Sequence, residues 1–515
     1  MTYRRFALLA LLCLPLSGAT FYISKTNGLD TRSSTTAQSK ATPWAHIPGM
    51  AGATSNAAGY SPNPGDRFIL YGGDTWGSTD LGGVNLTYSG SSGSTIYIGV
   101  DQTWFTGASW TRPIWSCQAT NCGNNSSTLG NVVWLAGNYL TLDNIEVTGY
   151  KYDGSSSNIV ATYGNGITVE NLYIHGWSRT GGSCGSGTND PFAMTMNWSN
   201  FGGEGTGNLF QYNVIDGSDS SDIGGNYCFG GILHGNIVHG NIVRYVYDGM
   251  NGIFNVIDGN LVEYNNLSTT GDHCNMIYPQ GVFSGTVIQV SNNVVRHSVC
   301  SGGTTIFMLA NSANPSYVAY AFNNVLYDNE VNSDKGFSIG GPSTNGTFYY
   351  YNNTVVTATG ACMQNGSAGT GTAHYGNFHC ISPTICNFVN GSCINDGGNV
   401  QQTAAQADSD SSPRFDQYTA SETYAYSPVA STNSTVGVGT DFTSSCSGVF
   451  ASLCTSDSTY TSYDSVNHKA VSRSTTSRPA TGVWDAGAYE FSGGTTILPS
   501  ILGSGMNITP GVTLR

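Results

Sequence analysis

The chain has 515 residues, of which only 9% are charged, and its formal net charge at pH 7 is −14. Such an acidic surface repels nucleic acid and anionic membranes, so we expect neither as a partner. It also disfavours polyanionic substrates unless a bound cation intervenes. Because 39% of the residues are hydrophobic, the low charge does not indicate disorder.

Residues 1–19 have the pattern of a secretory signal peptide. Arg4 and Arg5 form a basic start, residues 6–16 an apolar stretch and residues 17–19 a small-residue cleavage site. The apolar stretch is shorter than the about 20 residues that a membrane-spanning helix needs, and no later stretch qualifies. We therefore expect an exported protein, extracellular or periplasmic, that is not inserted in a membrane.

Cysteine usage agrees with export. Of the 13 cysteines, Cys13 lies in the signal peptide, and the others form an even set without CxxC spacing. This favours disulfides over metal ligands, although sequence alone leaves their connectivity open. Local pairing is the simplest arrangement, and it gives the pairs Cys117–Cys122, Cys184–Cys228, Cys274–Cys300, Cys362–Cys380, Cys386–Cys393 and Cys446–Cys454.

Residues 20–130 are expected to form an N-terminal cap and the first coils of a repeat. The turn signal at residues 64–66 leads into the apolar strand RFILYGG. This end is rich in tryptophan, which we interpret as packing within the cap. The alternative is a sugar-stacking platform, which would need the rings exposed in one line; the residues are Trp76, Trp104, Trp110 and Trp115.

Residues 131–384 carry a recurring unit in which an asparagine precedes a short apolar strand. The spacing between units indicates a base coil in the low twenties of residues with variable insertions, which is typical of a solenoid. Asparagine tolerates the left-handed backbone at a turn, and stacked amides can hydrogen-bond from coil to coil. The units begin at Asn144, Asn171, Asn213, Asn236, Asn260, Asn293, Asn324, Asn353 and Asn377.

The repeat fades after residue 384. Residues 385–491 are rich in Ser, Thr, Ala and Asp and are expected to form C-terminal coils and a loop-rich cap, ending in a strand at residues 485–491. Residues 492–515 are predicted to be a poorly ordered tail.

Three features together resemble the right-handed parallel β-helix proteins of the pectate-lyase-like superfamily. They are the opening FYIS…NGLD followed by PGDRFILYGG, the asparagine repeat, and the ending WDAGAYEF. The resemblance covers roughly residues 21–491. It implies an all-β, right-handed, single-stranded parallel β-helix with caps at both ends. The superfamily includes lyases, hydrolases, epimerases and proteins without known activity, so the fold does not select one function.

The most prominent constellation lies in two aligned copies of a D-x-x-N pattern, Asp248 with Asn251 and Asp272 with Asn275, with His273 beside the second aspartate. If the copies stack one coil apart, two adjacent carboxylates raise one pKa or hold a cation between them. The first case suits acid–base cleavage of a glycan, and the second suits Ca²⁺ held by Asp248, Asp272 and Asn275. The alternative is that these aspartates only form turns.

A second set of polar residues follows the asparagines by three positions, at Asp216, His239, Glu263, Arg296 and Tyr327. On one face they would line a groove and bind substrate, together with Asp222 of the preceding turn. The alternative is a structural ladder of alternating charge, which we consider the better interpretation for any single member.

From these residues and the resemblance we expect a secreted, monomeric, carbohydrate-active protein that cleaves an extracellular polysaccharide as a lyase or a glycoside hydrolase. Ca²⁺ is the only cofactor suggested. The alternative function is a non-catalytic glycan-binding or cell-surface β-helix protein, because the full residue sets of the known hydrolase and lyase groups are not reproduced.

Overall fold

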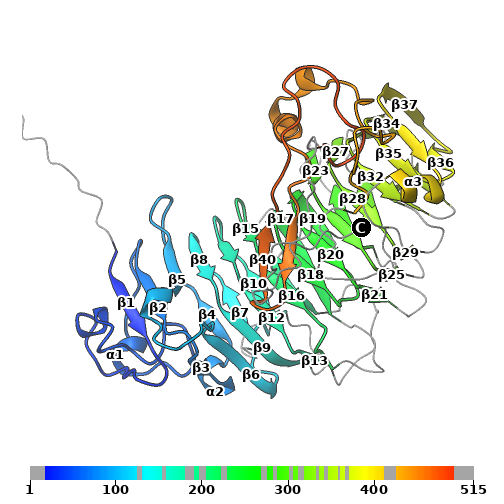
Figure 1. Cartoon of the computed structure of the whole chain (residues 1–515). Helices are drawn as coiled ribbons and strands as arrows, with labels where there is room; N and C mark the ends of the chain where they lie inside the picture. The colour runs from blue at the N-terminus through cyan, green and yellow to red at the C-terminus, as the bar shows by residue number, and fades with distance from the viewer. Residues whose placement is uncertain are drawn as a thin grey trace, which may run out of the picture.

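The computed structural model describes residues 18–123, 130–152, 158–179, 191–196, 205–221, 229–267, 275–281, 287–300, 305–310, 318–331, 336–340, 346–357, 360–365, 371–410 and 425–491. Within them the chain winds through three columns of short parallel strands, and from β2 onward successive coils add strands to these columns (Figure 1). This is the predicted parallel β-helix. No helix in these ranges is long and apolar enough to cross a membrane.

Two of the columns belong to one 22-stranded sheet, because the long strands β17 and β19 run from the first column into the second without a break. The first column is β4 (Val84–Leu86), β7 (Val133–Leu135), β10 (Val160–Thr162), β14 (Phe192–Met196), β17 (Gly230–His239), β19 (Met250–Asp258), β22 (Ile277–Gly281), β26 (Ile306–Ala310), β30 (Phe337–Gly340), β33 (Ala361–Asn365) and β36 (Thr384–Asn387). The second is β1 (Thr20–Ile23), β2 (Arg67–Leu70), β5 (Ile96–Val100), β8 (Leu140–Asp143), β11 (Thr168–Glu170), β15 (Leu209–Gln211), the ends of β17 and β19, β23 (Val287–Ser291), β27 (Val318–Phe322), β31 (Gly346–Tyr351), β34 (Gly371–Gly376) and β37 (Ser392–Gly397).

The third column is a separate 13-stranded sheet. Its strands are β3 (Thr75–Trp76), β6 (Ile114–Thr120), β9 (Glu146–Tyr152), β12 (Tyr173–His175), β13 (Ser178–Arg179), β16 (Val214–Asp216), β18 (Ile242–Arg244), β20 (Leu261–Glu263), β24 (Val294–Arg296), β28 (Val325–Tyr327), β32 (Thr354–Val356), β35 (His379–Ile381) and β38 (Val400–Gln402). The remaining elements are short: α1 (Ser55–Ala58), α2 (Ser78–Leu81), α3 (Ala404–Asp410), β21 (Asn266–Leu267), β25 (Val299–Cys300), β29 (Glu330–Val331), β39 (Thr461–Asp464) and β40 (Lys469–Ser472), with 3-10 turns at Thr36–Gln38, Gln102–Trp104, Thr443–Ser445 and Gly448–Cys454.

The turn between the second and third columns explains the asparagine repeat. Its first residue has a left-handed backbone, as at Asn292 (φ 54°), and its second is an asparagine whose amide bonds to the next coil. The Asn293 Oδ1 accepts from the backbone N–H of Asn260 at 3.0 Å and from its Nδ2 at 2.9 Å. The ladder runs through Asn213, Asn241, Asn260, Asn293, Asn324 and Asn353, all buried. Every rung therefore satisfies polar groups that the core would otherwise leave unbonded.

Two details of the predicted repeat are wrong. The rung between Asn213 and Asn260 is Asn241 rather than Asn236, so the coil from Asn241 to Asn260 has only 19 residues. Asn144, Asn171 and Asn377 occupy the left-handed position rather than the rung, with φ between 49° and 59°. The two roles that asparagine was predicted to combine are thus divided between neighbouring positions.

The ends of the described chain pack on the solenoid. The tryptophans differ in exposure: Trp76 and Trp115 are fully buried, whereas Trp104 and Trp110 are half-buried. Four predicted disulfides are present, and the other two involve Cys184, Cys228 and Cys274, which lie outside the described residues. Residues 485–491 do not form the predicted strand; Trp484 makes an isolated bridge to Gly439 instead.

A segment that we call the strap, residues 456–473, runs back along the third column toward the N-terminus and contains the hairpin β39–β40 (Figure 1). Asn323 donates to the carbonyl of Ser456 at 3.4 Å, and Thr461 N donates to Gly259 at 2.9 Å. At the hairpin tip Arg112 donates to the carbonyl of Asn467 at 2.8 Å. The strap therefore connects residues of many coils and covers the outer face of the third column.

Candidate functional site

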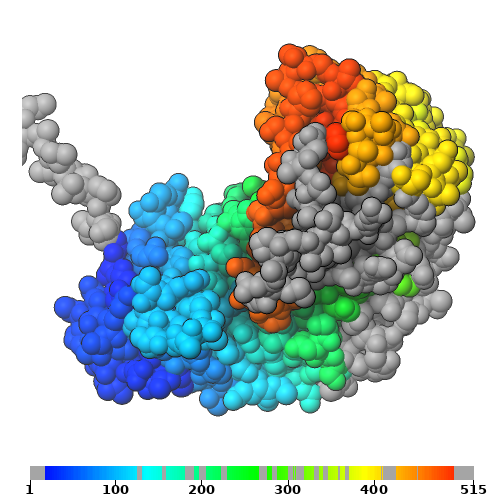
Figure 2. Space-filling model, viewed as in Figure 1, coloured from blue at the N-terminus to red at the C-terminus, as the bar shows by residue number. Residues whose placement is uncertain are grey.

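The second column carries a row of polar side chains at the outward position where each strand ends. Successive members pair in register on neighbouring strands, about 4.8 Å apart. We call it the polar row; its members are Asp143, Glu170, Gln211, His239, Asp258 and Ser291. The residue before each of the first five is buried in the core, so these five side chains point outward. They are half-buried there. Figure 2 shows the surface hollowed between the N-terminal coils and the C-terminal segment, above the strands labelled β8 and β15 in Figure 1.

Two carboxylates are adjacent at the start of the polar row. Asp143 accepts hydrogen bonds from the hydroxyl of Tyr97 at 2.6 Å and from Nδ2 of Asn171 at 2.7 Å. Glu170, on the next strand, accepts from Nε2 of Gln211 at 2.6 Å. Burial raises the pKa of Glu170 above its ordinary value, the Gln211 hydrogen bond lowers it, and the charge of Asp143 raises it further. The pair thus places a carboxyl group that holds its proton more readily beside a carboxylate stabilised by two donors.

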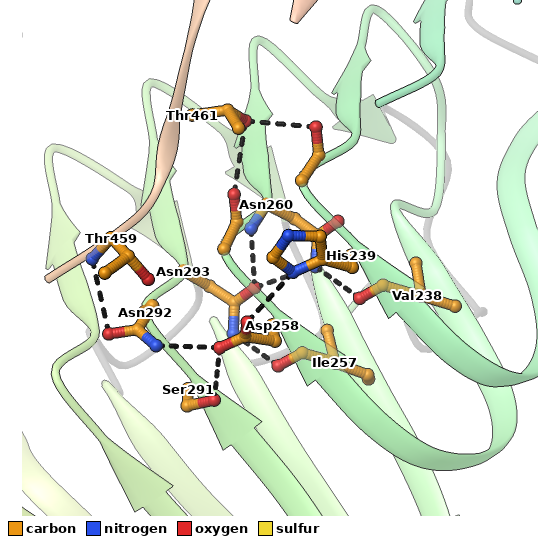
Figure 3. A network of polar contacts seen from close by, with 12 residues as sticks. Val238, His239, Ile257, Asp258, Asn260, Ser291, Asn292, Asn293, Thr459 and Thr461 are labelled. Atoms are coloured by element: carbon orange, nitrogen blue, oxygen red, sulfur yellow. Dashed lines mark hydrogen bonds and ion pairs between the residues drawn. The ribbon is translucent and has the colours of Figure 1, made fainter. Parts of the chain in front are cut away.

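The middle of the polar row is a hydrogen-bonded chain centred on His239 (Figure 3). Its Nδ1 lies 2.9 Å from Oδ2 of Asp258, and its Nε2 lies 3.1 Å from the hydroxyl of Tyr212. Oδ1 of Asp258 accepts from Ser291 at 2.6 Å and from Asn292 at 2.7 Å. Asp258 therefore fixes the orientation of the imidazole, while the side chains of His239 and Tyr212 remain half-exposed.

The predicted row three residues after the asparagines lies on the third column, with one change of membership. The register runs Asp216, Arg244, Glu263, Arg296, Tyr327, so Arg244 takes the place predicted for His239. This prediction for His239 is wrong because the rung of that coil is Asn241, not Asn236. His239 belongs to the polar row instead. Arg244 could have been found by counting three residues from Asn241.

These third-column side chains bond to one another beneath the strap. Glu263 lies 2.8 Å from Arg296 Nη2 and 3.3 Å from Arg244 Nε, and Tyr463 of the strap donates to Asp216 at 3.1 Å. Asp216, Glu263 and Arg296 are at most 6% exposed. Burial lowers the pKa of Arg296, but neighbouring Tyr327 and Glu263 outweigh it and raise that pKa well above its usual value. The geometry is that of the structural ladder named above as the alternative to substrate binding.

The two D-x-x-N copies do not stack in the predicted alignment. Met250 pairs with Ile277 and Asn251 with Tyr278, so the expected stacking of Asn251 on Asn275 is wrong. An insertion in this coil moves the second copy out of register. Asp248 is buried, and its Oδ2 accepts from Nδ2 of Asn251 at 2.6 Å. Asp272, His273 and Asp222 lie outside the described residues.

The proposed Ca²⁺ site can be compared with the residues that the structure describes. Asn275 is buried like Asp248, and Gln280 donates to Oδ1 of Asn251 at 3.1 Å. Ca²⁺ prefers six to eight oxygen ligands, and here the amides and the carboxylate bond to each other. No group of three or more His, Cys, Asp or Glu side chains in the described ranges could hold a metal ion. Asp272 lies outside the described residues, so the Ca²⁺ site stays a prediction from the sequence, and we route no chemical step through a metal.

One charged cluster, centred on His175, was not predicted from the sequence. Its Nδ1 lies 2.7 Å from Asp219 and its Nε2 lies 3.2 Å from Glu146. Burial lowers the pKa of His175, but the two carboxylates outweigh this effect and raise it to about 9. The ring also stacks on Tyr173, which in turn stacks on His468 at the strap tip. The two carboxylates lie 44 and 29 residues from His175 in the sequence, so no local motif reveals the cluster.

Comparisons with known proteins give matches among solved structures only. No protein-family model and no curated protein matches the chain. A structure of pectate lyase Pel9A is similar at 15% identity and a TM-score of 0.43, over 92% of this chain and 96% of that chain. A GH136 lacto-N-biosidase from Eubacterium ramulus is similar at 12% identity and a TM-score of 0.36, over 75% of this chain and 68% of that one.

An alginate lyase from Paenibacillus sp. str. FPU-7 is also similar, at 12% identity and a TM-score of 0.26, over 64% of this chain and 93% of that chain. By their names, two of these proteins are lyases and one is a lacto-N-biosidase. They include a pectate lyase, the kind of protein that the sequence resembles. At TM-scores below 0.5 we draw nothing from them about the activity of this chain.

Proposed function

We propose that the protein is a carbohydrate-active enzyme that cleaves an extracellular polysaccharide bound along the polar row. The observation that carries this proposal is the adjacent pair of Asp143 and Glu170, with the pKa of Glu170 raised by burial and by its neighbour. A carboxyl group with a raised pKa beside a second carboxylate is an arrangement that hydrolysis of a glycosidic bond uses. The pair favours a hydrolase over a lyase.

In this proposal Glu170 donates its proton to the oxygen of the glycosidic bond as that bond breaks. Asp143 accepts a proton from the water that attacks the sugar carbon, or attacks that carbon itself. Tyr97 and Asn171 hold the Asp143 carboxylate in place, at 2.6 and 2.7 Å. Gln211, His239 and Tyr212 lie farther along the row, where they can hydrogen-bond the hydroxyl groups of neighbouring sugar units. The disulfides agree with the predicted export to an oxidising compartment.

The test is a screen of the purified protein on neutral glycans, pectin and alginate, with and without Ca²⁺. Reducing ends report hydrolysis, and ultraviolet absorbance of an unsaturated product reports a lyase. We expect Glu170→Gln and Asp143→Asn each to lower kcat by at least about 100-fold. Asp101→Asn removes a surface carboxylate in the N-terminal coils and should leave the rate unchanged.

The outcomes separate the alternatives. Full activity in Glu170→Gln would refute the assignment of the proton donor. Loss of activity only in Asp248→Ala and Asp272→Ala would instead support the pair predicted from the sequence. Binding of a glycan without cleavage by the wild-type protein would support the non-catalytic alternative, which the mutual hydrogen bonds within the row also permit.

A further inference from the structure

A second row of outward side chains runs beside the polar row and differs from it in character. Leu209, Ile237 and Val256 pair in register on β15, β17 and β19, and each lies two residues before a member of the polar row. We call these three residues the apolar row. Ile237 is 38% exposed, and the other two are half-buried. Alternation along a strand puts both rows on the same outer face, about 7 Å apart.

The two rows together make an amphipathic track on the second column. Neighbouring strands are about 4.8 Å apart, close to the length of one hexose unit, so side chains recur along the track at the spacing of a sugar chain. A pyranose ring has an apolar face of C–H groups and an edge of hydroxyl groups. The apolar row matches the ring face, and Gln211, His239 and Asp258 match the hydroxyl edge.

The charges along the track select against acidic sugars. The polar row contains the carboxylates of Asp143, Glu170 and Asp258, and the outward positions of both rows between Thr141 and Ser291 hold no Lys or Arg in the residues that the structure describes. A uronate carboxylate lying here would face like charge without a cationic partner, which lowers affinity. An uncharged sugar meets hydrogen-bond acceptors for its hydroxyl groups instead.

We infer that this track binds an uncharged polysaccharide, with the apolar row under the sugar rings and the polar row along their hydroxyl groups. The inference rests on the proposed function in using the same face, and it adds the substrate class. It makes Ile237 the specificity-determining residue, because its side chain is the most exposed of the apolar row.

The test measures affinity rather than cleavage. Affinity electrophoresis of the wild-type protein would compare soluble β-glucan and mannan with polygalacturonate and alginate, in EDTA and in Ca²⁺. We expect at least one neutral glycan to bind, and the polyuronates to bind at least about ten-fold more weakly at low salt. Ile237→Ala should weaken the neutral glycan about ten-fold, since it removes apolar contact area.

Val287→Ala is the matched control, because Val287 is 40% exposed on the same column but lies outside both rows. A second variant, Ile237→Lys, supplies the missing cation and should raise polyuronate affinity about ten-fold. The inference is overturned if polyuronates bind the wild-type protein as tightly as neutral glycans, in either buffer, or if no neutral glycan binds. It is also overturned if Ile237→Ala binds like the wild type. Neutral-glycan binding without cleavage would remove the enzyme proposal and leave this inference standing.

Discussion

Replacing His175 by glutamine should destabilise the protein in a pH-dependent way. In the folded chain the pKa of His175 is raised to about 9 by Asp219 and Glu146, against the lowering effect of burial. A group whose folded pKa lies above its unfolded value stabilises fully below the unfolded pKa, about 6.5, and loses that contribution as the pH rises through the folded pKa. The His175 contribution is therefore complete near pH 6 and lost above about pH 9.

The size of the effect follows from the shift and the exposure of the partners. The difference between about 9 and the ordinary 6.5 corresponds to at most about 3 kcal/mol. The Asp219 side chain is 51% exposed, so solvent screens its part of the interaction. We therefore expect His175→Gln to lower the free energy of unfolding by about 1–2 kcal/mol at pH 6.

Urea unfolding followed by fluorescence, at about pH 6 and about pH 9.5, measures this difference. The gap between wild type and variant should narrow at the higher pH, because the wild-type imidazole is then neutral. A double-mutant cycle with Glu146→Gln separates the ion pair from lost packing against Tyr173. An equal gap at both pH values would contradict the reasoning, since packing does not titrate in this range.

Two further predictions concern the ladders. Asn293→Ala removes a buried rung that bonds to the coils on both sides, and should lower the free energy of unfolding in urea by about 2–4 kcal/mol. The control is Asn255→Ala at an exposed position, which should lower it by less than about 0.5 kcal/mol. Glu263→Gln leaves Arg244 and Arg296 without their shared carboxylate and should cost about 3–5 kcal/mol. Because the strap covers this ladder, Glu263→Gln should also speed proteolysis within residues 456–473; unchanged cleavage would show that the strap docks independently of the ladder.

The fold could be predicted because its signal is repeated in every coil. A turn that needs a left-handed residue and then a buried amide imposes the same two positions on coil after coil, and the asparagines mark them. The position of each residue within its coil was harder to predict. The sequence HGNIVHGNIV at residues 234–243 offers two equivalent asparagines, Asn236 and Asn241. In the structure β17 continues from the first column into the second through an irregularity at His234, so Asn236 lies within a strand and only Asn241 is at the turn.

This single ambiguity accounts for several errors. Taking Asn236 as the rung gives a regular spacing to Asn260, which supports stacking the two D-x-x-N copies. It also puts His239 on the third column and hides Arg244. The true coil is short, at 19 residues, and the next, at 33 residues, is long because of an insertion. Insertions change the number of residues in a coil without changing the fold. Sequence spacing alone therefore cannot assign residues of different coils to a common face.

From Gln211 onward, each member of the polar row lies two residues before an asparagine of the ladder. That position ends the strand and faces outward, and the residue after it has the left-handed backbone of the turn. In the coils from Asp143 to Ser291 it is polar, whereas in the next two coils it is Phe322 and Tyr351. There the C-terminal segment covers it: Phe322 is buried, and Tyr351 contacts Phe442 with ring centroids 4.8 Å apart. The position is thus aromatic where the C-terminal segment covers it and polar in the coils that come before. Each carboxylate of the row is hydrogen-bonded within the protein: Asp143 accepts from Tyr97 and Asn171, Glu170 from Gln211, and Asp258 from Ser291 and Asn292. These hydrogen bonds hold half-buried carboxylates in fixed orientations on the outer face, which is the arrangement that the proposed glycan site requires.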